Sequence, residues 1–331
     1  TYSSAVNDGG AIYIAGSDAT ISNSTLNFNN ATSYGGAIFV DGANACLDGD
    51  VFEYCSSDRL NGGAVYVKGV NTTISNSNFT RNRVNIANFA LGGAVYVAGS
   101  DAKLFNTSFE MCIAYNGAVL YLDGDDAVID GSTFMYSSAF NDGGAIYVAG
   151  NNAVISNSTF TLNNATQNGG AVYVAGNNAN IDGTTFFKCS TINMNGGAVY
   201  VAGLNTTISN SNFTKNSANG TNARGGSLEI QGSGTKVLGT TFDQCIAYEG
   251  GAIYVNGTDA IIDDSSFTRC AARINGGAIY VAGNNAIISG SEFEYNNGTD
   301  YGGSIYIEGD NTLIIGDHFE RCSVINRYGG A

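Results

Sequence analysis

One short segment recurs twelve times along this chain of 331 residues. Its first copy is GGAIYIAG at 9–16, and later copies include GGAVYVAG at 92 and GGAIYVAG at 276. Successive copies begin 25 to 30 residues apart, and the chain stops inside a thirteenth copy at 329–331. A fixed period of this length is typical of a solenoid, in which each repeat buries its apolar face only against its neighbours.

The repeats also recur as blocks of five. The first five spacings add up to 134 residues and the next five to 133. NGGAVYVKGVNTTISNSNFTRN at 61 matches NGGAVYVAGLNTTISNSNFTKN at 195, and MCIAYNG at 111 parallels QCIAYEG at 244. These matches indicate a duplicated five-coil unit and predict one continuous domain over residues 1–331. Because residues 1–8 align with 135–142 in mid-repeat, we expect the chain to be an internal stretch of a longer one.

When the twelve repeats are aligned, some positions hold only aliphatic or aromatic residues. These positions predict three strands in each repeat. The first strand holds aliphatic residues two apart, as at Ile12 and Ile14, with Tyr13 between them, so Tyr13 should point outward. A second strand carries an aliphatic residue such as Ile21, and a third carries an aromatic residue such as Phe160. Asn, Gly or Asp follows the second strand, where a left-handed turn is expected. The pattern predicts an all-β, right-handed parallel β-helix of about 12 coils, with three strands per coil.

Composition narrows the classes of partner. The net charge is -15 with only 13 Lys and Arg, which disfavours nucleic acid and anionic membranes. No apolar run is long enough for a spanning helix, so we expect no membrane insertion by this segment. Cations, basic surfaces or neutral glycans are the expected partners.

The paired signature GGA[ILV] and FxxN, as in GGAIYVAG at 143 and FTLN at 160, resembles the repeats of the polymorphic outer-membrane protein family. The whole chain is similar to adhesin-like β-helix proteins of prokaryotic cell surfaces. The resemblance implies an extracellular, cell-surface structural or adhesive role, as the stalk or filament of an adhesin-like protein. Its faces would bind glycans, sister copies or neighbouring surface proteins. The chain departs from the family in that half of its FxxN positions carry Cys.

Six of the seven cysteines occupy the Asn position of FxxN. We expect them to be buried thiols that stack with the equivalent residues of neighbouring coils. Alternate coils lie about 10 Å apart, which is too far for a disulfide, so only Cys245 and Cys270 on neighbouring coils could be bridged. Cys46 stands at an outward position, where it is either a cross-link to another chain or an idle surface thiol.

The outward aromatic row is the leading binding candidate. It either stabilises the stack by ring packing or forms an exposed contact surface for sugar rings or a neighbouring copy. The row is interrupted by Glu229, and its members are Tyr13, Phe39, Tyr66, Tyr96, Tyr121, Tyr147, Tyr173, Tyr200, Tyr254, Tyr280 and Tyr306.

A carbohydrate-active enzyme resembling pectin lyases is the alternative function, and it requires clustered carboxylates with a basic partner. The candidates are Asp123, Asp125 and Asp126 in one turn and Asp263 and Asp264 in another. Asp is an ordinary turn residue at these positions, so we expect no catalytic residue, no metal and no cofactor. His318 is expected to be a solvated side chain.

Twelve N-x-S/T sequons occur, and two lie in the turn before a Gly pair. If the chain is exported by a glycosylating cell, these two, Asn219 and Asn297, are the best candidates for glycosylation.

Overall fold

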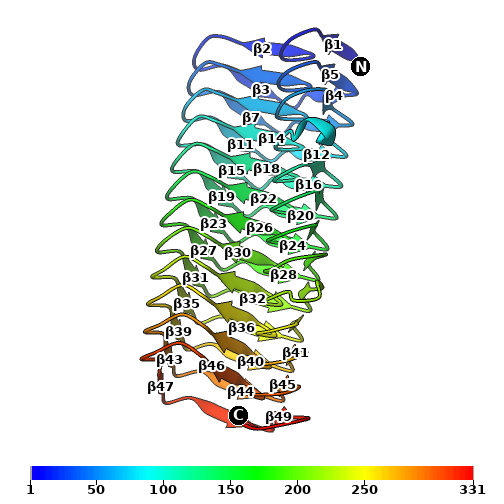
Figure 1. Cartoon of the computed structure of the whole chain (residues 1–331). Helices are drawn as coiled ribbons and strands as arrows, with labels where there is room; N and C mark the ends of the chain where they lie inside the picture. The colour runs from blue at the N-terminus through cyan, green and yellow to red at the C-terminus, as the bar shows by residue number, and fades with distance from the viewer. Residues whose placement is uncertain (1, 331) are drawn as a thin grey trace. The chain divides into compact units, whose positions relative to one another are not determined.

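The computed structural model describes residues 2–330, apart from the side chain of Asn88; Thr1 and Ala331, the ends of the predicted domain, lie outside the described residues. The chain divides into two compact units, residues 1–163 and 164–331. Within each unit the chain winds into stacked coils whose strands run in parallel (Figure 1). The predicted all-β parallel solenoid of about 12 coils is therefore confirmed, with six Gly-pair repeats in each unit.

Each coil contributes one strand to each of four sheets. We call them the Gly-pair sheet, the aliphatic sheet, the Phe sheet and the short-strand sheet, after the sequence features that they carry. One 3-10 turn, η1 (Ile86–Asn88), follows a short strand of the first unit.

In the unit of residues 1–163, the Gly-pair sheet contains β2 (Ile12–Ile14), β6 (Ile38–Val40), β10 (Val65–Val67), β14 (Val95–Val97), β18 (Leu120–Leu122) and β22 (Ile146–Val148). The aliphatic sheet contains β3 (Thr20–Ser22), β7 (Cys46–Asp48), β11 (Thr73–Ser75), β15 (Lys103–Phe105), β19 (Val128–Asp130) and β23 (Val154–Ser156). The Phe sheet contains β4 (Thr25–Asn27), β8 (Val51–Glu53), β12 (Asn78–Thr80), β16 (Ser108–Glu110), β20 (Thr133–Met135) and β24 (Thr159–Thr161). The short-strand sheet contains β1 (Ser3–Ala5), β5 (Asn29–Ala31), β9 (Ser56–Ser57), β13 (Arg83–Val84), β17 (Ile113–Ala114) and β21 (Ser138–Ala139).

In the unit of residues 164–331, the Gly-pair sheet contains β26 (Val172–Val174), β30 (Val199–Val201), β34 (Leu228–Ile230), β38 (Ile253–Val255), β42 (Ile279–Val281) and β46 (Ile305–Ile307). The aliphatic sheet contains β27 (Asn180–Asp182), β31 (Thr207–Ser209), β35 (Lys236–Leu238), β39 (Ile261–Asp263), β43 (Ile287–Ser289) and β47 (Leu313–Ile315). The Phe sheet contains β28 (Thr185–Phe187), β32 (Asn212–Thr214), β36 (Thr241–Asp243), β40 (Ser266–Thr268), β44 (Glu292–Glu294) and β48 (His318–Glu320). The short-strand sheet contains β25 (Asn164–Ala165), β29 (Ser190–Thr191), β33 (Ser217–Ala218), β37 (Ile246–Ala247), β41 (Ala271–Ala272), β45 (Asn297–Gly298) and β49 (Ser323–Val324).

The prediction of three strands per coil is wrong, because the short-strand sheet adds a fourth. Most of its strands begin directly after the Asn, Cys or Ser of the FxxN position, as β9 does after Cys55. Most of them are only two residues long, which is too few for an alternating pattern to be recognised in sequence.

Equivalent residues of neighbouring coils pair in register, so identical side chains stack on one another. Val65 pairs with Val95, and Tyr66 pairs with Tyr96. Inside the first unit, the rings of Phe52, Phe79, Phe109, Phe134 and Phe160 stack with centroids 4.4 to 5.0 Å apart. All five are fully buried, which confirms the inward direction predicted for this column.

The FxxN position forms a second buried ladder beside the Phe column. The Asn82 side chain donates to the Phe52 carbonyl at 3.0 Å and accepts from the Cys55 N–H at 2.9 Å, so its polar atoms are satisfied between two coils. In the next coil the Cys112 thiol lies 3.9 Å from the Phe79 carbonyl oxygen and 3.5 Å from that of Glu110, so it makes only weak contacts. Five of the six ladder cysteines are fully buried, as predicted; the sixth, Cys322, is partly exposed.

The two positions of each Gly pair require glycine for different physical reasons. The first Gly adopts the left-handed region, as Gly35 does at φ 61°. The second lies where coils approach most closely: a Cβ added to Gly36 would lie 2.1 Å from the Gly63 carbonyl oxygen and 2.3 Å from that of Ser56. The left-handed turn expected after the second strand is also confirmed, for example at Asn23 (φ 49°) and Gly49 (φ 69°).

Candidate functional site

The predicted aromatic row lies on the outer side of the Gly-pair sheet in both units. In the first unit, neighbouring rings from Tyr13 to Tyr147 have centroids 4.8 to 5.2 Å apart and planes within 8° of each other. In the second unit, Tyr173 stacks on Tyr200 at 5.0 Å, and Tyr254 stacks on Tyr280 at 4.6 Å. The stacking account of this row is thus supported by its geometry.

The expected exposure of this row is wrong for four members, which are between 3 and 7% exposed: Phe39, Tyr96, Tyr254 and Tyr280. Neighbouring rings cover the faces of each ring, and side chains from the turns before the Gly pairs lie against some of the rings. Tyr34 lies 4.5 Å from the ring of Tyr66, and the Arg224 guanidinium lies 4.6 Å from that of Tyr254. The row therefore offers ring edges, rather than open ring faces, to a partner.

Glu229 replaces an aromatic residue in the row and pairs in register with Tyr200 and Tyr254. Its side chain is fully buried; one carboxyl oxygen accepts from the Gln231 amide, and the other, Oε2, has no hydrogen-bond partner. Burial raises the pKa of Glu229 to about 8, so the neutral acid predominates at pH 7. A carboxyl group enclosed in this way has no direct path to a substrate.

The cysteine candidates remain thiols. Cys46 is half-buried on β7, and burial, with Asp48 nearby, raises the pKa of its thiol, which makes it a weaker nucleophile at neutral pH. Cys245 and Cys270 are both fully buried and unbridged. The Ser227 hydroxyl lies 2.8 Å from the Cys245 sulfur.

The two candidate glycosylation sites differ in accessibility. Asn219 is exposed in the loop after β33, and its amide donates to the Ser217 hydroxyl at 3.2 Å. Asn297 is half-buried within β45, and its Oδ1 is buried without a hydrogen-bond partner. Asn219 is the better placed of the two for modification.

The carboxylates considered for catalysis mostly take part in contacts between coils. Asp123 accepts from the Tyr96 hydroxyl at 2.9 Å, Asp125 from the Asn151 N–H at 2.7 Å, and Asp126 from the Asn152 amide at 3.0 Å. Asp263 accepts from the Ser289 hydroxyl, and Asp264 occupies the left-handed turn. His318 is exposed, with Nε2 4.0 Å from a Glu320 oxygen. Within residues 2–330, no group of three or more His, Cys, Asp or Glu side chains is arranged to hold a metal ion.

Sequence reasoning missed a second set of exposed aromatic residues. Two residues after each member of the Phe column, whose first member is Leu26, the backbone adopts the left-handed region whatever the side chain, and we call these residues the left-handed column. All of its members except Gln244 are exposed. The members are Phe28, Tyr54, Arg81, Met111, Tyr136 and Leu162 in the first unit and Lys188, Lys215, Gln244, Arg269, Tyr295 and Arg321 in the second. Non-Gly residues rarely adopt this conformation, and these residue types gave no signal of it.

The column places aromatic rings and cations side by side. Phe28 stacks on Tyr54 with centroids 5.0 Å apart and planes 5° apart, and the Arg81 guanidinium lies 5.4 Å from the Tyr54 ring. In the second unit the Arg321 guanidinium lies 5.3 Å from the Tyr295 ring. These contacts hold the long side chains over the short-strand sheet.

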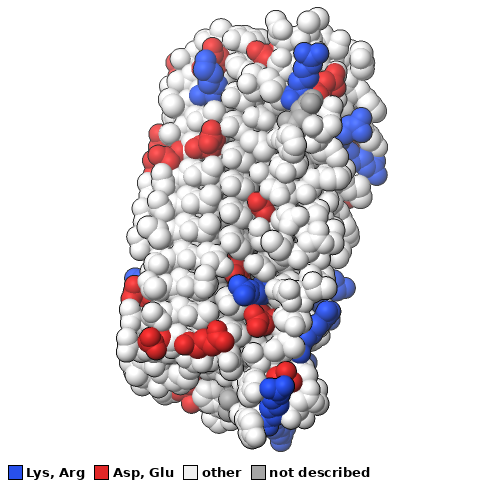
Figure 2. Space-filling view, in the orientation of Figure 1, with Lys and Arg blue, Asp and Glu red and all other residues white. Residues whose placement is uncertain are grey.

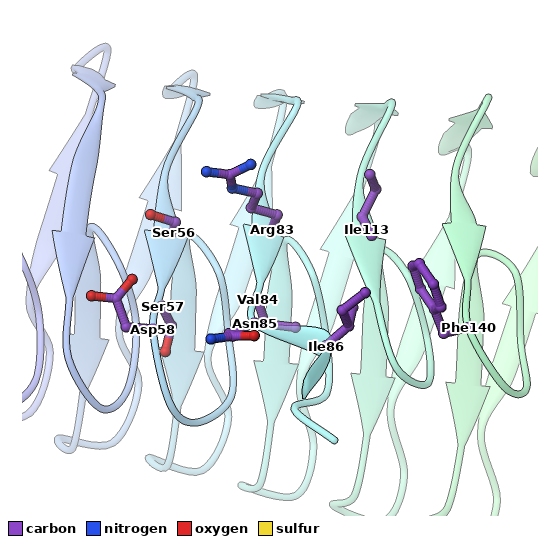
Figure 3. A pocket seen from close by; sticks show the side chains of 9 residues that line it. All are labelled: Ser56, Ser57, Asp58, Arg83, Val84, Asn85, Ile86, Ile113 and Phe140. Carbon is purple, nitrogen blue, oxygen red and sulfur yellow. The ribbon is translucent and has the colours of Figure 1, made fainter. Parts of the chain in front are cut away.

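Two adjoining hollows lie beside the column in the first unit, and we call them together the aromatic groove. The first, about 360 Å³, is lined by Phe28, Tyr54, Ser56, Arg81, Arg83, Met111 and Ile113. The second, about 410 Å³, is lined by Ser56, Ser57, Asp58, Arg83, Val84, Asn85, Ile86, Ile113 and Phe140. Figure 3 shows Ser56, Arg83 and Ile113 side by side on three consecutive coils, with Phe140 on the next coil and Ile86 in the loop below Arg83. The groove therefore combines flat apolar surfaces with hydroxyl, amide and guanidinium donors.

A second groove, of about 480 Å³, lies over the short-strand sheet of the second unit, and we call it the cationic groove. Its lining consists of Lys215, Asn216, Ser217, Asn219, Gln244, Ile246, Arg269 and Arg273. Three of these residues carry a positive charge and none is aromatic.

Positive charge is concentrated on this side of both units. Ten of the 13 Lys and Arg residues fall between the left-handed column and the following Gly pair; the exceptions are Lys68, Lys103 and Lys236. Figure 2 shows that Lys and Arg side chains are few on the drawn face and that several of them lie along the right-hand edge. A chain with a net charge of -15 thus presents a cationic and aromatic face, which we define as the left-handed column, the short-strand sheet and its following loops.

The chain belongs to the right-handed β-helix family, whose model, described as a right-handed β-helix region, matches residues 10–186 and 93–231. A search of curated proteins finds no match. The fold is similar to that of the tailspike protein of E. coli bacteriophage HK620, solved as a double mutant with a pentasaccharide, with 9% identity, a TM-score of 0.51, and coverage of 99% of this chain and 72% of that one. A mutant of the periplasmic alginate epimerase AlgG is 8% identical, with a TM-score of 0.44 and coverage of 89% and 74%.

Among residues 2–330, no helix is long and apolar enough to cross a membrane.

Proposed function

We propose that this chain is an extracellular structural and adhesive β-solenoid that binds glycans through its cationic and aromatic face. The observation that carries the proposal is the stacked pair of Phe28 and Tyr54, which are 52% and 39% exposed beside the aromatic groove. Exposed rings in a soluble protein commonly mark a contact surface. The exposed parts of these two rings present apolar surface that can contact the C–H groups of sugar rings.

The polar groups of the groove supply the second part of sugar recognition. Arg83, Ser56 and Asn85 add guanidinium, hydroxyl and amide groups near the apolar surfaces of Ile113 and Phe140. Ligand sites typically combine a mainly apolar lining with a few polar groups that orient the ligand. The volumes of both hollows fall within the ordinary range for small-molecule sites, roughly 300 to 1,000 Å³.

Three further points support the proposal, and the first of them favours an adhesive role over a catalytic one. The aromatic groove contains one carboxylate, Asp58, and the cationic groove contains none, whereas most glycoside hydrolases use a pair of carboxylates. The tailspike with the same fold was solved with a pentasaccharide. The GGA[ILV] and FxxN repeats resemble those of adhesin-like cell-surface proteins, which supports an extracellular location.

The test is binding to an array of cello-, xylo- and galacto-oligosaccharides, followed by titration calorimetry on those that bind. The double variant Phe28→Ser/Tyr54→Ser should lose about tenfold in affinity, because each removed ring contact contributes on the order of 0.5–1.5 kcal/mol. Leu162→Ser is the matched control, since Leu162 occupies the same column in the same unit but lines neither hollow.

Binding to no glycan would refute the proposed function, and unchanged affinity of the double variant would refute the assignment of the face. Release of new reducing ends during incubation would show that the chain is an enzyme instead.

A further inference from the structure

The two grooves occupy corresponding positions of the five-coil duplication. Residues 133 or 134 positions apart correspond, so Arg81 matches Lys215, Asn85 matches Asn219, and Ile113 matches Ile246. These pairs keep a cation, an amide and an aliphatic side chain at equivalent places. The duplication therefore produced two copies of one groove.

The aromatic positions have changed in the second copy. Tyr54 corresponds to Lys188, Tyr136 to Arg269, and Phe140 to Arg273. Met111 corresponds to Gln244, which replaces a thioether with an amide. Each of these changes exchanges an apolar or aromatic surface for a hydrogen-bond donor, and three of the four add a positive charge. Arg83 corresponds to Ser217, and this change removes one positive charge.

The cations of the second groove differ in how far they are already neutralised. Arg269 forms two hydrogen bonds to Asp243 Oδ1, at 2.7 and 3.0 Å. Lys215 and Arg273 are exposed and have no carboxylate within 4.0 Å among the described residues. Lys215 and Arg273 therefore remain unpaired beside the donors Asn219 and Gln244, and no carboxylate lines this groove, whereas Asp58 and Arg83 both line the aromatic groove.

We propose that the cationic groove binds an acidic polysaccharide through its carboxylate groups, whereas the aromatic groove binds uncharged sugar rings. This inference rests on the proposed glycan-binding function and names the ligand class for one of its two sites. Arg guanidinium and Lys ammonium groups pair with carboxylates, while the amides and the Ser217 hydroxyl can serve the sugar hydroxyls. Equivalent side chains recur about every 4.8 Å from coil to coil, a spacing comparable to one sugar unit of an extended chain.

A second copy of this chain is a weaker candidate for the same groove. Two copies each carry a net charge of -15, so long-range repulsion opposes their approach. A uronate hexasaccharide carries far fewer negative charges than a second copy of the chain, so the same long-range repulsion opposes it less.

The experiment compares a β-1,4-linked glucuronate hexasaccharide with its carboxyl-reduced, neutral counterpart, using titration calorimetry on the whole chain. At about 20 mM salt, where charges are weakly screened, the acidic ligand should bind at least about tenfold more tightly than the neutral one. Lys215→Gln/Arg273→Gln should abolish this preference, and Lys215→Arg/Arg273→Lys should retain it. Raising the ionic strength to about 0.5 M should reduce the preference in the unmodified chain.

Phe28→Ser/Tyr54→Ser is the control in the other unit, and it should weaken binding of the neutral ligand but keep the binding of the acidic one. If neutral sugars bind and the acidic ligand shows no preference, or if the preference survives Lys215→Gln/Arg273→Gln, the inference is wrong while the proposed function stands. If neither ligand binds, and the glycan array is also empty, the proposed function itself fails. If Lys215→Gln/Arg273→Gln instead abolishes self-association in sedimentation experiments, with no sugar bound, the groove contacts another copy.

Discussion

Single residues of the left-handed column combine an unfavourable backbone conformation with an exposed side chain. A left-handed conformation costs a non-Gly residue roughly 1–2 kcal/mol. The cost is offset by a hydrogen bond to the next coil: the N–H of Tyr54 donates to the Thr80 carbonyl at 3.1 Å, and that of Arg81 to the Glu110 carbonyl at 2.9 Å. Because the turn is held by backbone groups, the side chain can vary freely, and this freedom allowed one groove to become aromatic and the other cationic.

Glu229 is the residue for which pH should matter most. Its pKa is about 8 in the folded chain, against an ordinary value of 4.5, so the folded state holds the proton more tightly than the unfolded state. The contribution of Glu229 to the free energy of unfolding should therefore be greatest below about pH 4.5 and should fall as the pH rises toward 8. Glu229→Gln should be more stable than the unmodified chain at pH 8 and similar to it at pH 5, as measured by urea unfolding.

The matched control is Glu292→Gln, which removes an exposed carboxylate of the same unit and should leave the pH dependence unchanged. An unmodified chain whose urea midpoint is the same at both pH values would contradict the assignment of Glu229 as a buried neutral acid.

At the scale of strands and coils, stability depends on how closely neighbouring backbones approach. The closing Gly of each Gly-pair segment stacks on the Gly of the neighbouring coil, and the second Gly of the pair faces two backbone carbonyls. The aliphatic sheet adds side-chain bonds across coils: Asp130 accepts from the Ser156 hydroxyl at 2.7 Å and from the Asn157 amide at 2.8 Å, and these bonds lower the pKa of Asp130. Coils are thus tied together by both backbone and side-chain contacts.

Gly42 tests the close backbone approach. A Cβ at Gly42 would lie 2.0 Å from the Gly16 carbonyl oxygen, so Gly42→Ala should force the coils apart and lower the free energy of unfolding by about 1–3 kcal/mol. Gly16 occupies the same repeat position, but a Cβ there meets no atom within 4 Å, so Gly16→Ala should change stability by less than about 0.5 kcal/mol. Equal effects of the two substitutions in denaturant unfolding would contradict the close-contact account.

For the whole molecule, the property that governs association is the large negative net charge, although one face is locally cationic. The net charge of -15 keeps copies apart at pH 7, whereas at the pI of about 4.2 that repulsion vanishes. The pKa values of Asp48, Asp130 and Asp182 lie below 3.8 because neighbouring Ser and Asn side chains bond to the ionised forms. Their contribution to stability is present above about pH 3.8 and is lost as pH falls through the lower folded values.

We therefore expect association of folded chains near pH 4.2 before any unfolding. Light scattering should rise between pH 7 and 4.2 while the β-sheet circular dichroism signal stays constant. A monodisperse solution at pH 4.2, or loss of the β signal above pH 3.8, would contradict this expectation.

Much of the fold could be predicted because each coil repeats the same local chemistry. Positions such as Val65 and Phe160 are aliphatic or aromatic in every repeat, and in-register stacking makes each such column a buried ladder. The candidate site could not be predicted in the same way. The exposure of Tyr96 depends on neighbouring rings and turn residues, and the conformation of Tyr54 depends on a hydrogen bond to the next coil.

The sequence alone determined the repeat, the direction of its alternating side chains, the buried Phe and Cys columns and the five-coil duplication, because all of these follow from periodicity along the chain. Only the tertiary structure decided the fourth strand, the burial of Phe39 and Tyr254, and the two grooves beside the left-handed column. These features arise where residues about 26 positions apart meet between coils. Contacts at that separation depend on the directions in which the turns place the side chains. A local pattern of residue types does not predict these directions.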